Sequence, residues 1–170
     1  ANSMLMSGKV FVNQKRIDKS GQQISTNSEI YIKGKIHPLV SRGGMKLEKA
    51  IVEYNLDCNS VIALDIGAST GGFTDVLLTK GAKKVYAVDV GYGQLDWKLR
   101  QDKRVIVNEK TNARFLSGEI IKDPLDVIVC DASFISLKKI LPSGLKFLKK
   151  NGWLAALIKP QFEVGKGLVG

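Results

Sequence analysis

The sequence predicts an α/β fold in which a doubly wound, mostly parallel sheet follows a small β-rich unit. Five short apolar runs rich in β-branched residues are typical of strands that are buried on both faces. Helix-like segments alternate with these runs, and that order predicts a parallel sheet with right-handed crossovers. The 170 residues, 44% of them hydrophobic, suffice for one full domain with a small appendage.

The front of the chain, residues 1–34, predicts the small β unit. Two stretches of alternating character, KVFV and EIYIK, indicate strands, and Asn13 with Gln14 predicts a tight turn after the first of them. The opening letters ANSMLMSG resemble the tail of a helix whose beginning is missing. Residues 35–40 include Pro and show no periodicity, so we expect a linker there.

The second unit, residues 41–170, holds the alternating elements. The spacing of its first apolar residues predicts a helix over 45–54, with Ser41 as a candidate cap. No run after the fifth strand supplies that strand's outer neighbour, so we expect the sheet to lack its last strands. The remaining elements are expected as strands at 60–66, 84–90, 104–108, 125–131 and 153–159, with helices at 72–80, 94–101, 113–121 and 136–150 between them.

Positive charge is concentrated at the front of the chain. The net charge is +10, and residues 1–46 hold eight Lys or Arg against only Asp18 and Glu29. A basic segment favours a polyanionic partner, because each phosphate that is neutralised releases counterions. The alternative is a solvated lysine surface that serves solubility.

Membrane insertion, secretion and metal binding are not expected. No apolar run approaches the length of a membrane span, and the first residues lack the pattern of a signal peptide, so we expect a cytoplasmic protein. Cys58 and Cys130 lie far apart without a Cys-x-x-Cys motif, and His37 is the only histidine. We therefore expect reduced thiols, no disulfide and no metal site.

The letters GASTGG at residues 67–72 follow the first strand of the expected sheet, and three known motifs fail to fit them. A dinucleotide fingerprint needs a glycine where Ser69 stands, and a Walker A loop needs a lysine where Phe73 follows Gly72. The third motif is the nucleophile elbow of hydrolases, whose pattern G-x-S-x-G is present in the letters GASTG. That motif requires a histidine later in the chain, whereas the only histidine lies upstream.

A turn suited to a nucleoside-bearing cofactor remains. Asp89 ends the second strand, 22 residues after Gly67, and an acid at that place can accept both hydroxyls of a ribose. A helix N-terminus that faces a carboxylate, not a pyrophosphate, suits the amino-acid half of S-adenosylmethionine. The alternative is a glycine turn that only packs the helix against the sheet.

Two charged residues end neighbouring strands of the expected sheet. Asp131 closes the fourth run and Lys159 closes the fifth, so their side chains can meet at the carboxyl edge, where open α/β sheets bind ligands. Such a pair can guide a proton off a hydroxyl group. The alternatives are a lysine that extends into water and an aspartate that caps the next helix.

Five motifs together resemble one family. VSRGGMKL, LDIGASTGGFTD, VDVGYGQL, CDASFIS and IKPQFEVGK are similar to the TlyA (haemolysin A) family of FtsJ-like S-adenosylmethionine-dependent rRNA 2′-O-methyltransferases. The resemblance runs from about residue 8 to residue 170 and implies a Rossmann-like fold. It implies methylation of a cytidine ribose in ribosomal RNA, with ribosomal RNA or ribosomal subunits as partners. It also implies a partial RNA-binding domain at the front, since SGKVFVNQKRIDKSG resembles the second half of the module found in ribosomal protein S four.

The resemblance assigns roles to single residues. Lys46, Asp131 and Lys159 match three members of a catalytic Lys-Asp-Lys-Glu set, whose fourth member, a Glu, has no counterpart here. Glu163 belongs to the KPQFE motif and is not given that role. The cofactor would contact Asp65, Gly67, Ala68, Ser69, Thr70, Gly71, Gly72, Asp89, Asn112 and Ala113, and the RNA backbone would contact Lys9, Lys15, Arg16, Lys33 and Arg42.

Two rival functions stay open. A membrane-lytic haemolysin, which the family's older name suggests, would need an amphipathic or membrane-spanning segment, and we find none in the sequence. A non-catalytic RNA-binding assembly factor would need only the basic front.

Overall fold

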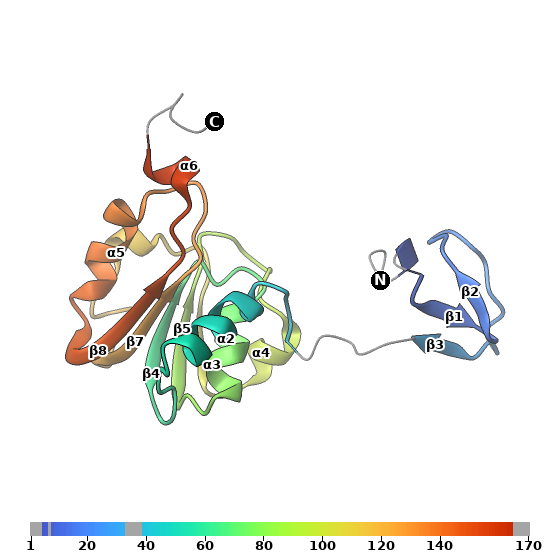
Figure 1. The fold of residues 1–170 in the computed structure, drawn as a ribbon, viewed down its shortest axis with the longest axis horizontal. Helices are drawn as coiled ribbons and strands as arrows, with labels where there is room; N and C mark the ends of the chain where they lie inside the picture. Colours follow the sequence, from blue (N-terminus) through green and yellow to red (C-terminus); the bar gives the residue numbers. More distant parts are fainter. Residues whose placement is uncertain (1–4, 7, 33–38, 165–170) are drawn as a thin grey trace. The chain divides into compact units, whose positions relative to one another are not determined.

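A computed structural model describes residues 5–6, 8–32 and 39–164 of the chain (Figure 1). The chain divides into two compact units, Ala1–Pro38 and Leu39–Gly170, and each is described by itself. Most of the expected linker lies outside the described residues. Within the described part, no helix has the length and apolar character needed to cross a membrane.

The first unit is an antiparallel sheet of β1 (Val10–Val12), β2 (Lys15–Ile17) and β3 (Ile30–Ile32), in the order β2-β1-β3. Asn13 and Gln14 connect β1 to β2. Both have a left-handed backbone, with φ of 47° and 67°, as a two-residue hairpin turn requires. The predicted turn and the predicted strands β1 and β3 are thus confirmed. The sequence did not predict β2, because its residues KRI carry no alternating apolar pattern.

The second unit is built on a sheet whose strand pairs are all parallel. Its strands are β4 (Ile62–Ile66), β5 (Lys84–Val88), β6 (Val105–Asn108), β7 (Leu125–Cys130) and β8 (Leu148–Ala156). The order β6-β5-β4-β7-β8 means that the chain builds outward from β4 on one side and then on the other. The predicted doubly wound fold is confirmed.

Helices cover both faces of this sheet (Figure 1). One face carries α2 (Gly44–Glu53), α3 (Gly72–Thr79) and α4 (Trp97–Gln101). The other face carries α5 (Leu137–Leu145) and the short 3-10 helix η1 (Ala113–Phe115).

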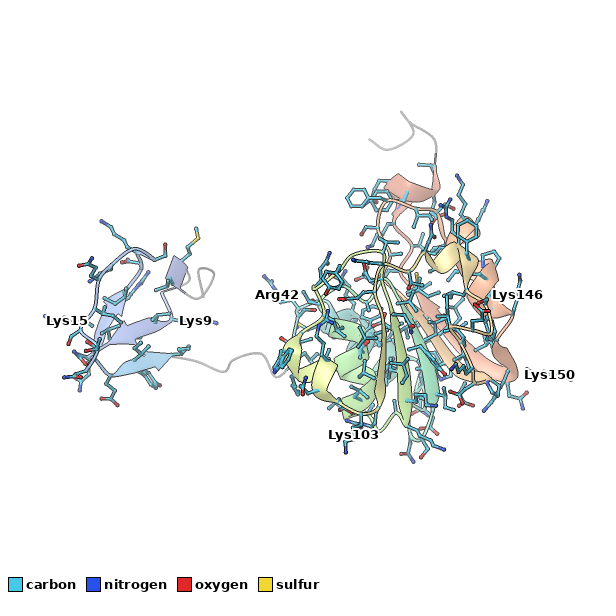
Figure 2. All side chains as sticks on the ribbon, turned by 180° about the vertical axis from the view of Figure 1, so that it is seen from behind. Lys9, Lys15, Arg42, Lys103, Lys146 and Lys150 are labelled. Atoms are coloured by element: carbon cyan, nitrogen blue, oxygen red, sulfur yellow. The ribbon has the colours of Figure 1, made fainter. Side chains whose placement is uncertain are left out.

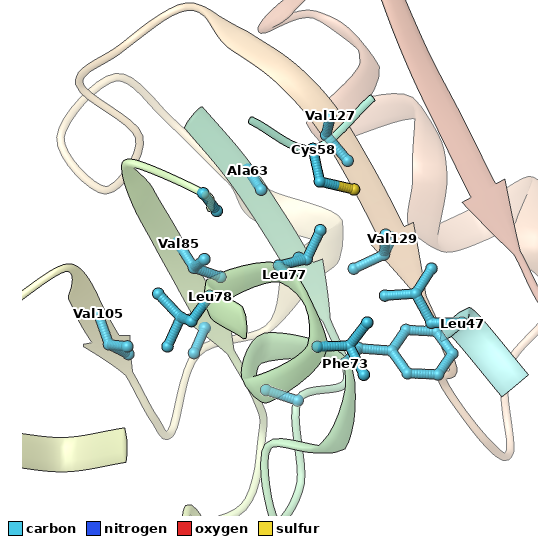
Figure 3. Close-up of a cluster of buried hydrophobic side chains, with 14 of the residues drawn as sticks. Leu47, Cys58, Ala63, Phe73, Leu77, Leu78, Val85, Val105, Val127 and Val129 are labelled. Carbon is cyan, nitrogen blue, oxygen red and sulfur yellow. The ribbon is translucent and has the colours of Figure 1, made fainter. Parts of the chain in front are cut away.

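Alternate residues of each central strand face opposite helical layers. Ala63 and Val85 pack with Leu77 of α3 in one hydrophobic cluster (Figure 3), whereas Leu64 packs with Ile140 of α5 in the other. Because both faces are buried, the central strands are continuous apolar runs. Their positions could therefore be predicted from the sequence.

Several predicted helix boundaries are wrong. Ser41 does not cap α2, because the N-cap residue is Gly43 and no side chain bonds to the first amides. The helix expected over 113–121 is limited to η1, since a Ser-Gly pair interrupts it. Helix α5 is shorter than expected because β8 begins early, where Leu148 pairs with Leu125 of β7.

The first turns of α2 and α3 approach closely through glycines. A Cβ atom added at Gly72 would lie 2.8 Å from the Gly44 nitrogen and 2.3 Å from Ser41 Oγ. A Cβ atom added at Gly44 would lie 2.7 Å from the Gly72 carbonyl oxygen. Real Cβ atoms do not approach backbone atoms so closely, so this crossing requires glycine on both helices.

We expect Gly72→Ala to lower the free energy of unfolding by about 1–3 kcal/mol, because backbone atoms must separate to admit the methyl group. Gly118→Ala is the matched control, since nothing lies within 4 Å of a Cβ atom at that position. Urea denaturation of both variants measures the difference. Equal stability of the two variants would contradict the close approach.

Candidate functional site

Two adjoining cavities open at the carboxyl ends of β4, β5 and β7, where the strand order reverses. The smaller has a volume of about 350 Å³ and the larger about 930 Å³. Gly67, Ser69, Asp131 and Ser133 line both. The other candidate residues divide between them: Lys46, Asp65, Ala68, Thr70, Gly72 and Lys159 line the smaller cavity, and Asp89, Asn112 and Ala113 line the larger.

The glycine turn between β4 and α3 bends sharply beside these cavities. Gly67, Ser69 and Gly71 have left-handed backbones, with φ of 80°, 48° and 94°. A Cβ atom at Gly67 would lie 3.0 Å from the Cα atom of Ala132, so glycine is required beside the loop that follows β7. Gly71 is not among the described residues that line either cavity; it is the N-cap of α3 and shapes the turn.

Asp65 is a buried carboxylic acid with one unused oxygen. It is 1% exposed, and its Oδ2 accepts hydrogen bonds from the Thr74 backbone nitrogen (3.0 Å) and from Thr74 Oγ1 (2.7 Å). Its Oδ1 has no hydrogen-bond partner among the described residues. Burial raises the pKa of Asp65 to about 7, and the charges of Asp131 and Asp89 add to this increase. A cationic group of a ligand in the smaller cavity could satisfy this oxygen.

Asp89 is fixed at the larger cavity by backbone amides. Its Oδ2 accepts a hydrogen bond from the Ser69 nitrogen (2.8 Å), and its Oδ1 accepts one from the Gly91 nitrogen (2.7 Å). Each oxygen has two lone pairs, so the carboxylate can still accept the two hydroxyls of a ribose. Asn112 caps η1 by accepting a hydrogen bond from the Arg114 nitrogen (3.1 Å), which positions its amide group beside the cavity.

Asp131 lies between two lysines. Its Oδ2 is 3.0 Å from Lys46 Nζ, and its Oδ1 is 2.7 Å from Lys159 Nζ. Lys159 donates its hydrogen bonds to the Asp131 carbonyl oxygen (3.1 Å) and to Ser133 Oγ (2.8 Å), so its contact with Oδ1 is an ion pair without hydrogen-bond alignment. Asp131 does not cap the next helix, because the N-cap of α5 is Ser136. The expected meeting of Asp131 with Lys159 therefore occurs, and Lys46 joins it from α2.

Sequence reasoning missed an aromatic pair at the larger cavity. Phe134, in the loop after β7, is 89% exposed and has a left-handed φ of 64°. Phe162 lies in α6 (Pro160–Glu163), a short helix that follows β8. The two ring centroids are 5.2 Å apart, and both residues line the cavity. Both rings belong to quoted motifs, but no pattern in the sequence indicates that a phenylalanine in a loop stays exposed.

The candidate RNA-binding cations are exposed within their own units. Lys15 and Arg16 lie in β2 of the first unit. Lys9 directly precedes β1, and Arg42 precedes α2 in the second unit (Figure 2). Lys33 lies outside the described residues and stays a prediction.

The cysteines are buried thiols, as the sequence predicts. Cys58 and Cys130 are both free, and burial raises the pKa of Cys130 to about 11. In the described ranges, no three His, Cys, Asp or Glu side chains gather as metal ligands would.

Comparison with known proteins identifies relatives along the whole chain. A family profile described as FtsJ-like methyltransferase matches residues 39–170. Hemolysin A of Brachyspira hyodysenteriae is 47% identical over 168 residues, which cover 98% of this chain and 70% of that protein. The 16S/23S rRNA (cytidine-2′-O)-methyltransferase TlyA of Mycobacterium tuberculosis is 52% identical over 131 residues, 77% of this chain and 49% of that protein.

A solved structure from Streptococcus thermophilus, which carries a hemolysin name, is 48% identical with a TM-score of 0.79. The match covers 99% of this chain and 62% of that chain. The chain thus spans about half to seven-tenths of the length of these relatives.

Asp65→Asn should change how stability depends on pH. The pKa of Asp65 rises from 3.8 to about 7 on folding, so the folded state keeps a proton that the unfolded state has lost. This contribution to stability is complete below the lower value and disappears as the pH rises through the higher one. We expect the wild type to lose on the order of a few kcal/mol more than the variant between about pH 4 and pH 8. Denaturant titrations across this range test the expectation, and parallel pH dependence in the two proteins would refute it.

Proposed function

Because this chain belongs to the FtsJ-like methyltransferase family, we propose that its protein transfers a methyl group from S-adenosylmethionine to a ribose 2′-hydroxyl of ribosomal RNA. The observation that carries the proposal is the cluster of Asp131 with Lys46 and Lys159, beside a glycine turn. The name of the Mycobacterium tuberculosis relative supports cytidine as the acceptor nucleoside. Such a substrate implies a cytoplasmic protein that acts on ribosomal RNA or ribosomal subunits.

The residues of the two cavities fit the cofactor. The unused oxygen of buried Asp65 would accept a hydrogen bond from its ammonium group, and Asp89 would accept its ribose hydroxyls. Asn112 and Ala113 would lie beside its adenine. When bound, S-adenosylmethionine supplies a methyl group on a positively charged sulfur. Carboxylates around the cavities suit that charge.

The Lys-Asp-Lys cluster acts through position and charge. Lys159 orients the attacking 2′-hydroxyl, whose proton passes to water as the bond from its oxygen to the methyl group forms. Asp131 fixes the orientation of Lys159 that this step requires. Lys46 stabilises the negative charge that develops on the 2′-oxygen. Alignment of the two reactants supplies a large share of the rate, because it converts a bimolecular encounter into a single oriented step.

The exposed cations and the aromatic pair hold the RNA. Lys9, Lys15 and Arg16 contact phosphates from the unit that resembles the S-four module. Phe134 and Phe162 present rings on which an unpaired base can stack, which is how proteins commonly hold single-stranded RNA.

The two rival functions do not require this site. A non-catalytic assembly factor would bind RNA through the basic first unit and transfer no methyl group. A membrane-lytic protein, which the hemolysin names of relatives suggest, would release haemoglobin from erythrocytes equally well with Lys159→Ala. Neither function needs a carboxylate bridged by two lysines, so the cluster at Asp131 favours the enzyme.

Methyl transfer can be measured directly. Asp131→Ala and Lys159→Ala should each lower kcat/KM for tritium transfer from labelled cofactor to unmodified ribosomal subunits by about 10²–10⁴. Lys49→Ala is the control and should leave the rate unchanged. It removes an exposed lysine from the same helix, α2, as Lys46. Mapping of 2′-O-methyl groups identifies the nucleotide. Absence of transfer by the full-length wild-type protein would refute the proposal.

RNA binding by the first unit should weaken as the salt concentration rises, as binding through phosphate contacts does. Lys15→Ala and Arg16→Ala should weaken binding, and each should reduce the slope of log K against log salt by about 0.7–0.9. Lys103→Ala, an exposed lysine just before β6, is the control (Figure 2). Filter binding over a range of salt concentrations gives the slopes. If the slopes of both variants equal that of the wild type, the RNA surface lies elsewhere.

A further inference from the structure

Glu163 ties α6 to the start of α5. Its Oε1 accepts a hydrogen bond from the Leu137 backbone nitrogen (2.8 Å), and its Oε2 accepts one from Ser136 Oγ (2.7 Å). Ser136 is the N-cap of α5, and its Oγ accepts a hydrogen bond from the Lys138 backbone nitrogen (3.2 Å). The Glu163 carboxylate thus satisfies an amide that the helix itself leaves unpaired, at the positive end of the helix dipole.

The segment that this carboxylate holds is short. Strand β8 ends at Ala156, and α6 spans only Pro160–Glu163. Its backbone bonds run from the Phe162 nitrogen to the Lys159 carbonyl (2.8 Å) and from the Val164 nitrogen to the Pro160 carbonyl (3.1 Å). A single helical turn is not stable in isolation, because its nucleation costs more than so few bonds return. Contacts from outside the turn must therefore fix its position.

Two residues of the candidate site belong to this segment. Lys159 immediately precedes α6 as its N-cap, and its Nζ reaches both Asp131 and Ser133. Phe162 lies inside α6, with its ring packed against Phe134. A displacement of α6 from α5 would therefore move the ammonium group and the aromatic ring together.

Glu163 is ionised at neutral pH, and each of its oxygens accepts a hydrogen bond. The hydrogen bond from Leu137, followed by that from Ser136, holds the pKa of Glu163 below its ordinary value. Both oxygens of Glu163 are directed at the start of α5, and Glu163 is not among the described residues that line the cavity of the Lys-Asp-Lys cluster, so it does not fill the place of the fourth catalytic residue.

We propose that Glu163 is a positioning residue that clamps Lys159–Glu163 to the N-terminus of α5, and thereby aims Lys159 at Asp131 and holds Phe162 against Phe134. The inference rests on the proposed methyl transfer, since it concerns how that site is assembled. It also gives the KPQFE motif a physical role: lysine for the site, phenylalanine for the aromatic pair, and glutamate for the clamp that orients both.

Three variants of the full-length natural protein test the clamp. Glu163→Ala removes both acceptors. Glu163→Gln keeps the shape and a carbonyl oxygen for the Leu137 amide. Ser136→Ala removes one of the two partners of Glu163, together with the N-cap hydrogen bond from the Lys138 amide. Glu119→Ala is the charge-matched control, because it removes an exposed acid from a loop outside the site. Thermal unfolding, cofactor affinity by equilibrium dialysis, kcat and KM for RNA, and amide exchange at Leu137 are measured for all four.

For Glu163→Ala, we expect kcat to fall about tenfold or more and KM for RNA to rise, because lost hydrogen bonds to a charged group release the segment. Cofactor affinity should change by less than about twofold, since Asp65 and Asp89 are untouched. Exchange of the Leu137 amide should accelerate in Glu163→Ala, and Glu163→Gln should recover most of kcat. The kcat of Ser136→Ala should lie between those of Glu163→Ala and Glu163→Gln. This variant keeps the test valid if Glu163→Ala does not fold.

Two outcomes would overturn the clamp. One is wild-type kcat in Glu163→Ala. The other is an equal loss in Glu163→Ala and Glu163→Gln with unchanged exchange at Leu137, which would indicate a direct chemical role for the acid. Failure of the proposed function looks different: the wild type itself transfers no methyl group, while amide exchange at Leu137 still reports whether the clamp exists.

Discussion

The candidate site depends on one interaction, the placement of the Asp131 carboxylate between two ammonium groups. Lys46 comes from a helix before the sheet, Asp131 follows the strand beside the centre, and Lys159 follows the edge strand. Each oxygen of the carboxylate faces a different lysine, at 3.0 Å and 2.7 Å. Two cations held this close would repel each other without the shared anion, so the carboxylate is what allows both to face the same small cavity.

Long side chains alone cannot set this geometry, because a lysine has many rotamers. The precision comes from the backbone beneath each lysine. On the side of Lys46, glycines let α2 and α3 touch, and the buried Asp75 of α3 accepts a hydrogen bond from the Val40 nitrogen at 2.9 Å, just before α2 begins. On the side of Lys159, a carboxylate joins α6 to α5. Each lysine thus extends from a segment that is hydrogen-bonded to the first turn of another helix, α3 for Lys46 and α5 for Lys159.

The predictability of each feature follows from how local its cause is. The five strands and the doubly wound parallel sheet were predictable, because burial on both faces makes the strands apolar throughout and alternation with helices indicates parallel crossovers. Asp131 was predictable as the residue at the end of β7. The predicted strand end at Lys159 is wrong, because β8 ends at Ala156 and Lys159 is the N-cap of α6. Lys46 was found through the resemblance alone, since nothing local indicates that a lysine in α2 will meet an aspartate 85 positions later. Phe134 and the partners of Glu163 were missed for the same reason: loop paths depend on tertiary contacts. The weakest predictions were helix ends, where the early start of β8 overrode a helical pattern.

The three carboxylates around the cavities affect which ligands the site favours. Burial raises the pKa of Asp65 to about 7, and the charges of Asp131 and Asp89 add to this increase. A pocket of this kind favours a ligand that carries positive charge over a neutral ligand of the same shape. Under the proposed function, methyl transfer from a sulfonium removes that charge, so these carboxylates would attract the by-product less strongly than the donor. The site would then discriminate between donor and by-product by electrostatics.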